Sequence, residues 1–366
     1  MVTSLVFHKQ KCRVDEMDNE KQCRLAIVGI GLVGQRHADA LAQVKNAALV
    51  AIADQSEDGR AYAERLGVPY FECLSSLMDQ AAPDGIILST PTNLHAEQGL
   101  LCISRAIPVL VEKPLATSTD AARPLVEAAQ KAQVPLLVGH HRRYNPIIQK
   151  AKEIILSGEI GDIRAVHATC WFYKPDHYFE EATWRKLKGA GPISVNLVHD
   201  VDLIRYLCGD IAVVQAHAAP SRRGFDNEDV AAAVFTLQNG AIGSITVSDS
   251  IVAPWSWEMT AREYPIYPMT SQSCYHIGGT HGSLSIPDLQ LWSHKQKRDW
   301  WTPMSATVAP RDSTDPLINQ IEHFIRVIQG AEAPLVSGCE GFRSLQVIEA
   351  IQKAADTLHP VTIKKD

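Results

Sequence analysis

Several features that would assign this chain to a specialised class are missing from its sequence. It has no block of basic residues and a net charge of −6, which argues against nucleic acid or an anionic membrane surface as a partner. The longest uninterrupted apolar run, Ala47–Ala53, is far too short to cross a bilayer. No internal repeat and no low-complexity segment is visible. These absences favour a small molecule, rather than nucleic acid or a membrane, as the partner.

Paired cysteines and a secretory signal are missing as well. The eight cysteines are scattered, and none forms a C-x-x-C pair. Several lie in apolar runs, so we expect reduced, buried thiols in a cytoplasmic protein rather than disulfides or a metal site. Residues 1–22 lack the apolar core of a signal peptide, and we predict that they are a disordered extension.

A glycine-rich turn near the N-terminus is the strongest motif present. Residues 25–43 read as a strand, the G-x-G-x-x-G turn and a helix. Gly29 permits the tight turn, Gly31 lets the backbone approach a pyrophosphate, and Gly34 lets the helix pack against the strand. The phosphates would then face free N–H groups and the positive end of the helix dipole. The motif residues expected to bind the cofactor are Gly29, Gly31, Leu32, Val33 and Gly34.

A carboxylate follows the next strand. Residues 48–53 form an apolar run that ends at Asp54, twenty residues after Gly34. At this position a carboxylate accepts hydrogen bonds from the adenosine ribose and repels a 2′-phosphate. We therefore predict NAD rather than NADP.

Strand-like and helix-like segments continue to alternate up to about residue 138, with Asn93 expected to cap one of the helices. This alternation predicts an N-terminal Rossmann domain, residues 23–144, with a doubly wound parallel sheet. Ligands bind such sheets outside the carboxyl ends of the strands. We expect five stretches at those ends to form one crevice: Gly29–Gly34, Asp54, Ser89–Asn93, Glu112–Pro114 and Gly139–Arg143.

The composition changes after Tyr144-Asn145-Pro146. Long strand-like runs follow with few helices between them, and Asn239-Gly240 is a strong hairpin signal. This pattern predicts that residues 145–366 form an α+β domain with a large, mostly antiparallel open sheet, which would bind the substrate. The helix at about 341–358 could pack back on the first domain.

Two residues carry the expected catalytic chemistry. Lys113 directly follows a buried strand, so it is presented at the nicotinamide end of the crevice, where partial desolvation would lower its pKa. Its bond to Pro114 could be cis. His199 lies on a predicted helix with Asn196 and Asp202 three residues away on either side, roughly on one face. An imidazole, with an unperturbed pKa of about 6.5, suits general acid–base catalysis.

Together these motifs resemble the Gfo/Idh/MocA family of NAD(P)-dependent oxidoreductases, which includes inositol dehydrogenase and glucose–fructose oxidoreductase. The resemblance covers the chain from Cys23 to about Leu358. It rests on five stretches in this order: Gly29–Gly34 with His37, Thr90-Pro91-Thr92-Asn93 with His95, Glu112-Lys113-Pro114, Gly139–Pro146 and Gly191–Asp202.

The resemblance implies hydride transfer between nicotinamide C4 and a hydroxyl-bearing carbon, with Lys113 and His199 in catalytic roles. It also implies a homodimer or homotetramer assembled through the open sheet of the second domain. The further residues that it places at the cofactor are Thr90, Pro91, Asn93, His95, Glu112 and Lys113.

One position departs from the family pattern. Many relatives have an aspartate four residues before the catalytic histidine, and Val195 stands there in this chain. Asn196 can form hydrogen bonds but cannot take a proton. The proton route could rest on His199 and Lys113 alone, or use Asp200 or Asp202, and the sequence leaves these alternatives open.

Polar and aromatic clusters on predicted loops provide candidates for substrate binding. Aromatic faces with fixed donors suit a sugar ring, and arginine suits a carboxylate. Packing or a subunit contact explains any one of them equally well. The clusters are Arg142-Arg143, Trp171–Lys174, Trp184-Arg185 and Trp255-Ser-Trp257, and they supply the candidates Arg142, Tyr173, Trp184 and Arg185. The predicted helix adds Asn196 and His199, and for His199 beside Lys113 catalysis is favoured over packing.

The leading hypothesis is an NAD-dependent dehydrogenase that oxidises a secondary hydroxyl of a sugar, cyclitol or related ring. His199 would take the hydroxyl proton while Lys113 stabilises the developing alkoxide. Alternatives are a dihydrodiol dehydrogenase acting on a cyclic diol with or without a carboxylate, and NAD-dependent glycoside cleavage. A further alternative is a dinucleotide-sensing regulator without turnover, against which the presence of both Lys113 and His199 argues.

Overall fold

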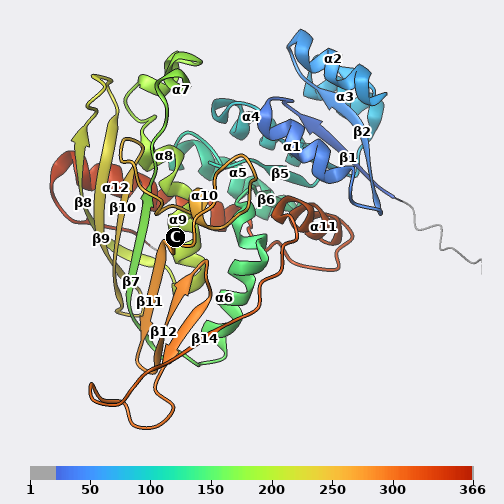
Figure 1. Ribbon diagram of the computed structural model, residues 1–366. Helices are drawn as coiled ribbons and strands as arrows, with labels where there is room; N and C mark the ends of the chain where they lie inside the picture. The colour runs from blue at the N-terminus through green and yellow to red at the C-terminus, as the bar shows by residue number, and fades with distance from the viewer. Residues whose placement is uncertain (1–21, 365–366) are drawn as a thin grey trace, which may run out of the picture.

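The computed structural model describes residues 22–364, which form two sheets with their associated helices (Figure 1). The extension predicted for residues 1–22 lies, except for Gln22, outside the described residues. Within residues 22–364 no helix has the length and apolar character needed to cross a membrane.

The first sheet is the Rossmann sheet that the sequence predicted. Its six strands are all parallel and run in the order β3-β2-β1-β4-β5-β6, so the order reverses between β1 and β4. The strand residues are mostly apolar and buried, as a sheet covered on both faces requires. The strands are β1 (Cys23–Val28), β2 (Ala47–Ala53), β3 (Tyr70–Phe71), β4 (Gly85–Leu88), β5 (Val109–Val111) and β6 (Leu136–Val138).

Five helices alternate with these strands, as the sequence predicted. The first begins at Leu32, directly after Gly31, rather than at residue 35. The prediction that Asn93 caps the fourth helix is wrong, because that helix begins at Thr92 and the Asn93 side chain is exposed in its first turn. The helices are α1 (Leu32–Leu41), α2 (Glu57–Leu66), α3 (Leu74–Ala81), α4 (Thr92–Ser104) and α5 (Thr119–Ala132).

The second sheet is large and mostly antiparallel, as predicted. Nine strands run in the order β14-β13-β12-β11-β7-β10-β9-β8-β15, and only the β7–β10 pair is parallel. Asn239-Gly240 forms the predicted tight connection between β9 and β10, with Gly240 at φ +84°. The strands are β7 (Ile163–Trp171), β8 (Ile211–Pro220), β9 (Glu228–Leu237), β10 (Ile242–Ser248), β11 (Tyr275–Gly279), β12 (Gly282–Ile286), β13 (Gln290–Ser293), β14 (Ser305–Val308) and β15 (Val361–Thr362).

Helices cover one face of this sheet and leave the other open (Figure 1). The helix that the sequence predicts from about Asn196 to Leu207 is confirmed as α9, and a further short helix, α8, precedes it and ends at Asn196. The remaining elements are 3-10 turns η1 (His141–Tyr144) and η2 (Thr183–Lys186), and helices α6 (Pro146–Leu156), α7 (Asp176–Glu180), α8 (Pro192–Val195), α9 (Leu197–Cys208), α10 (Trp257–Thr260), α11 (Pro316–Ile328) and α12 (Gly338–Thr357).

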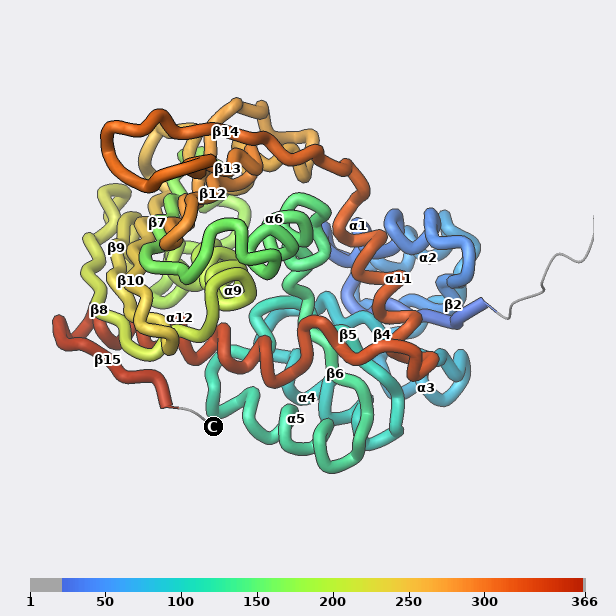
Figure 2. The backbone as a smooth tube through the Cα atoms, turned by 90° about the horizontal axis from the view of Figure 1, so that it is seen from below, coloured from blue at the N-terminus to red at the C-terminus, as the bar shows by residue number. Residues whose placement is uncertain are grey.

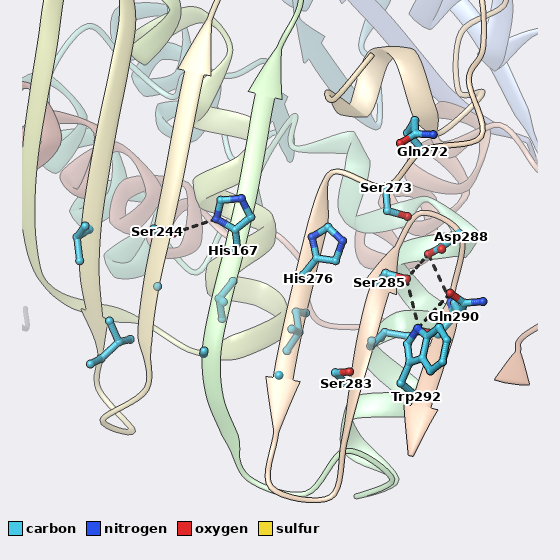
Figure 3. Close-up of a pocket in the computed structure, with 18 of the residues that line it drawn as sticks. His167, Ser244, Gln272, Ser273, His276, Ser283, Ser285, Asp288, Gln290 and Trp292 are labelled. Carbon is cyan, nitrogen blue, oxygen red and sulfur yellow. Dashed lines mark hydrogen bonds between the residues drawn. The ribbon is translucent and has the colours of Figure 1, made fainter. Parts of the chain in front are cut away.

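The open face carries a broad groove of about 700 Å³. Figure 3 shows His167 of β7, His276 of β11 and Trp292 of β13 along it. The two imidazole rings are stacked, with their centroids 6.3 Å apart. Apolar side chains line part of the groove: Val234 and Ile242 border it and are 56% and 59% exposed. This groove lies on the sheet face opposite the covering helices, away from the crevice described below.

The last two helices return to the first sheet. Phe324 of α11 is fully buried in one apolar cluster with Leu25 and Ile27 of β1. Figure 2 shows that α12 extends between β6 and β15, and it contacts both of these strands. Close to β6 the contact is tight, since a Cβ atom on Gly341 would lie 2.5 Å from a methyl carbon of Val138. Helix α12 therefore packs against both sheets.

Candidate active site

The three glycines of the turn between β1 and α1 differ in what surrounds them. A Cβ atom on Gly29 would lie 2.7 Å from the backbone nitrogen of Thr90, and one on Gly34 would lie 2.1 Å from the Gly29 carbonyl oxygen. At Gly31 no heavy atom lies within 4 Å of that position, and no side chain caps the helix there. The fold thus requires the outer two glycines, whereas Gly31 leaves open space before uncapped N–H groups. Leu32 and Val33 are exposed at this edge.

Asp54 lies beside this turn, at the end of β2. One carboxylate oxygen accepts a hydrogen bond of 2.7 Å from the backbone N–H of Ile30, and the other accepts two from Ser56. Burial opposes ionisation of Asp54, but the hydrogen bonds from Ser56 and Ile30 outweigh it and lower the pKa. A carboxylate is therefore held ionised next to the glycine turn. The space and charge at this edge fit a dinucleotide.

The end of β5 holds a buried carboxylate. One carboxylate oxygen of Glu112 accepts a hydrogen bond of 2.8 Å from His37, and the other accepts one of 3.1 Å from the backbone N–H of Lys113. Burial opposes ionisation of Glu112, but His37 overcomes it and lowers the pKa to about 2. A Cβ atom on Gly139 would lie 2.6 Å from this carboxylate. Glu112 thereby fixes the backbone that carries Lys113, and the Lys113–Pro114 peptide is cis.

The Lys113 side chain is partly exposed, and its ammonium has no partner in the described part of the chain. In residues 22–364 nothing accepts a hydrogen bond from its ammonium or forms an ion pair with it. Burial is the largest cause that lowers its pKa; Glu112 opposes this effect, and Arg142 and Lys174 add to it. The amine is thus free to contact a ligand.

His199 reaches the same crevice from α9 of the second domain. The ring is 7% exposed and lies edge-on to the rings of His140 and His141, at centroid distances of 6.3 and 5.6 Å. Burial lowers its pKa well below the usual 6.5, and the charge of Lys113 is the next largest cause. Its Nδ1 has no hydrogen-bond partner. Lys113 and His199, eighty-six residues apart in sequence, are therefore neighbours.

The other predicted cofactor residues follow β4: Thr90 and Pro91 lie in the loop, and Asn93 and His95 lie in the first turn of α4. His95 is buried, and its ring nitrogens lie 2.9 and 2.8 Å from the carbonyl oxygens of Pro114 and Thr90. Both nitrogens are thus occupied by protein groups, and His95 joins this loop to the one that follows Lys113. The side chains of Pro91 and Asn93 are exposed.

The two carboxylates after His199 have different environments. Asp202 receives two hydrogen bonds from Arg143, of 2.7 and 2.8 Å, and one of 2.9 Å from Ser344. Asp200 accepts a hydrogen bond from Tyr275, while its second oxygen has no partner. Burial raises the pKa of Asp200 to about 6, although Arg142 acts in the opposite direction. Asp202 is committed to structure, and Asp200 retains one free oxygen.

Arg142 is buried between the two domains. Its Nη2 donates to Glu258 of α10, and Nη1 lies 3.7 Å from Asp200. Neither Nε nor Nη1 has a hydrogen-bond partner in the described part of the chain. The neighbouring His141 pairs with Glu263 at 2.9 Å. The segment containing Glu258 and Glu263 is thus bound to the end of the first domain.

Sequence reasoning did not identify Glu258 or Glu263 as members of this site, and it named Lys174 only as the end of a polar–aromatic cluster, without a role of its own. Lys174 lies beyond β7 and donates a hydrogen bond of 2.8 Å to Asn196 Oδ1. The polar–aromatic run that ends at Lys174 was the one local signal for it. The two glutamates follow no local motif.

Three predicted substrate residues lie farther out, on the segment that contains α7 and η2. Tyr173 and Trp184 are 49% and 53% exposed. Arg185 packs over the ring of Tyr178 at 4.0 Å and pairs with Glu181 at 2.7 Å. No contact with Lys113 or His199 is formed by these three, so their part in substrate binding stays a prediction.

Comparison with known protein families matches both parts of the chain. Residues 23–140 match the oxidoreductase family with an NAD-binding Rossmann fold, and residues 148–285 match the GFO/IDH/MocA C-terminal domain.

Individual relatives cover nearly the whole chain. An inositol 2-dehydrogenase of Saccharopolyspora erythraea is 30% identical over 336 residues, which are 89% of this chain and 91% of that protein. The myo-inositol 2-dehydrogenase of Thermotoga maritima is 24% identical, over 93% of this chain and 99% of its own. Among solved structures, the WlbA dehydrogenase of Bordetella pertussis, in complex with NADH and UDP-GlcNAcA, superposes with a TM-score of 0.76 at 25% identity. The superposition covers 94% of this chain and 100% of the WlbA chain. The chain therefore belongs to the GFO/IDH/MocA family of oxidoreductases, with an NAD-binding Rossmann domain at its N-terminus.

Proposed function

We propose that this protein is an NAD-dependent dehydrogenase that oxidises a secondary hydroxyl of a sugar, a cyclitol or a related hydroxylated ring. The observation that carries the proposal is that Lys113 follows β5 at the carboxyl edge of the parallel sheet, while buried His199 of α9 lies close enough for the charge of Lys113 to act on its imidazole. Relatives named for inositol oxidation support the substrate class.

The two side chains have complementary protonation states. Because the pKa of His199 is well below 6.5, its ring is neutral at pH 7 and can accept the hydroxyl proton. The Lys113 ammonium can donate a hydrogen bond to the same oxygen as negative charge develops on it. Bound NAD supplies the hydride acceptor.

The first domain supplies the residues that would hold the dinucleotide. The backbone at Gly31, Leu32 and Val33 offers N–H groups for the pyrophosphate, and Asp54 offers a carboxylate for the adenosine ribose. Because Asp54 stays ionised, it opposes a 2′-phosphate and favours NAD.

The other predicted cofactor residues divide into two groups. Pro91 and Asn93 are exposed at the start of α4 and could contact the nicotinamide half directly, whereas the Thr90 hydroxyl donates a hydrogen bond of 2.6 Å to Gln98. His95 and Glu112 already have protein partners, so we assign them the task of holding the two loops in place.

We further infer that the protein is a cytoplasmic homodimer or homotetramer that assembles through the open face of the second sheet. Exposed Val234, Ile242 and Trp292 on that face support this inference, since apolar groups gathered on a surface mark interaction sites.

NAD reduction, followed at 340 nm with inositols, sugars, sugar acids and cyclic diols, tests the function. Replacing Lys113 by Met should lower kcat by about 10²–10⁴-fold, because a positioned proton donor contributes that much. NADH binding, measured by fluorescence titration, should stay close to normal. Exposed Lys131, on α5, replaced by Met is the matched control. Unchanged turnover without the Lys113 amine would refute the assignment.

A further inference from the structure

Lys174 is a buried cation beside the proposed active site that the oxidation scheme does not use. It is 7% exposed. Its Nζ donates a hydrogen bond of 2.8 Å to Asn196 and lies 3.4 Å from a carboxylate oxygen of Asp249. The ring centroid of Tyr178 lies 5.0 Å away. Neighbours on three separate segments therefore hold this ammonium in one place.

The charge and donors of Lys174 are only partly matched. Asp249 is the only carboxylate paired with it within residues 22–364, and Asp249 also pairs with Arg223 at 3.3 Å. An ammonium has three N–H donors, of which Asn196 and Asp249 can accept two. Leaving a buried donor without an acceptor is costly. One N–H of Lys174 is thus available to a ligand.

Two more cations lie near Lys174 and have N–H donors without an acceptor in residues 22–364, although Glu258 and Asp200 lie beside the guanidinium of Arg142. Lys113 has no partner for its ammonium, and buried Arg142 has two nitrogens without hydrogen bonds. Asn196, which accepts the hydrogen bond from Lys174, also accepts one of 3.1 Å from the backbone N–H of His199. The His199 ring in turn lies 5.6 Å from that of His141, the residue before Arg142, so Lys174 and Arg142 lie on either side of His199. Unmatched donors of like charge around one space favour an oxyanion.

We propose that Lys174 determines specificity and that the substrate is a hydroxy acid, such as a sugar acid, with its carboxylate beside the reacting hydroxyl. Lys174 donates its free N–H to this carboxylate, and Arg142 is the second donor. Lys113 remains available for the reacting oxygen. The inference rests on the proposed dehydrogenase function, because it assigns a group on the substrate of that enzyme.

D-glucuronate and D-glucose form a matched pair, since they differ only in a carboxylate in place of a hydroxymethyl group. With the wild type and NAD, kcat/KM for D-glucuronate should exceed that for D-glucose by about tenfold or more, as a charge-assisted hydrogen bond provides. In Lys174→Met the ratio should fall to about one, and Lys174→Arg, which keeps the charge, should restore part of it. Lys188→Met is the control, because that side chain is 78% exposed.

A second measurement does not require turnover. A limiting amount of acetic anhydride acetylates accessible lysines, and peptide mass spectrometry measures the rate at Lys113. D-glucuronate should slow this acetylation in the NADH complex of the wild type but not in that of Lys174→Met. NADH titration first establishes that the variant is folded.

The outcomes separate the two proposals. Equal protection of Lys113 in wild type and variant, or equal kcat/KM ratios, overturns the role of Lys174. If no substrate reduces NAD while the protection still depends on Lys174, the carboxylate site stands and the dehydrogenase function fails.

Discussion

At the scale of single residues, ionisable side chains withdrawn from water determine the character of the crevice. Lys113 and His199 both have lowered pKa values, and burial is the largest cause for each. The shift favours the neutral form of both groups, but the usual pKa is 10.5 for the lysine and 6.5 for the histidine. At neutral pH the imidazole is therefore a proton acceptor, whereas the amine, with its higher usual pKa, can still carry a proton.

These shifts predict the pH dependence of activity. Oxidation requires neutral His199, so kcat/KM should rise with pH through a pKa well below 6.5 and be on its plateau at pH 7. It also requires protonated Lys113, so activity should fall at high pH, through a pKa below the usual 10.5. A pH profile measured at saturating NAD checks both limbs. An acid limb centred at pH 7 or above would contradict the role of His199.

A second prediction concerns the buried pair of Asp202 and Arg143. Asp202→Asn should destabilise the protein by about 3–5 kcal/mol at pH 7, because it leaves the guanidinium buried without its counter-charge. Urea unfolding measures the loss.

The pH dependence of this loss has a defined sign. Burial raises the pKa of Asp202, but His140 and Arg143 outweigh it, so the folded pKa is lowered. The stabilisation is therefore complete above the unfolded pKa of about 3.9 and is lost as the pH falls through the folded value. A difference between wild type and variant that stays constant down to pH 2 would exclude this origin.

At the scale of elements, the turn between β1 and α1 assigns different tasks to its glycines. Gly34→Ala should lower the thermal stability, because its Cβ would lie 2.1 Å from the Gly29 carbonyl oxygen. Gly31→Ala should leave the melting temperature nearly unchanged, since that space is open, but should weaken NADH binding at least about tenfold by obstructing the pyrophosphate. Calorimetry and fluorescence titration of both variants check this contrast. Normal NADH affinity in Gly31→Ala would contradict the proposed position of the cofactor.

Elements also show how far sequence reasoning could reach. The glycine turn, Asp54 and Lys113 were predictable because parallel strands bring their carboxyl ends to one edge, whatever else the chain does. Glu258 and Lys174 were not, because their positions depend on how loops of the second sheet pack against the first domain. The short helix α8 was equally hidden, since Gly191-Pro192 at its start is typical of a turn.

At the scale of the whole molecule, the open face of the second sheet is the proposed contact between subunits. Ile242→Asp should reduce the sedimentation mass to that of a monomer, because it places a charge on a side chain that is 59% exposed on this face. Leu156→Asp, on α6 and 72% exposed, is the control. An assembly unchanged by Ile242→Asp would place the subunit contact elsewhere.

The return of α11 to the first sheet has a consequence for how the protein is made. The first 140 residues leave the ribosome without the helix whose Phe324 and Ile321 complete their apolar cluster. Domains usually fold as units while translation proceeds, N-terminal domain first. Here the nascent Rossmann sheet must wait for nearly two hundred further residues, with one face covered only in part by α1 and α2, before its apolar cluster is complete.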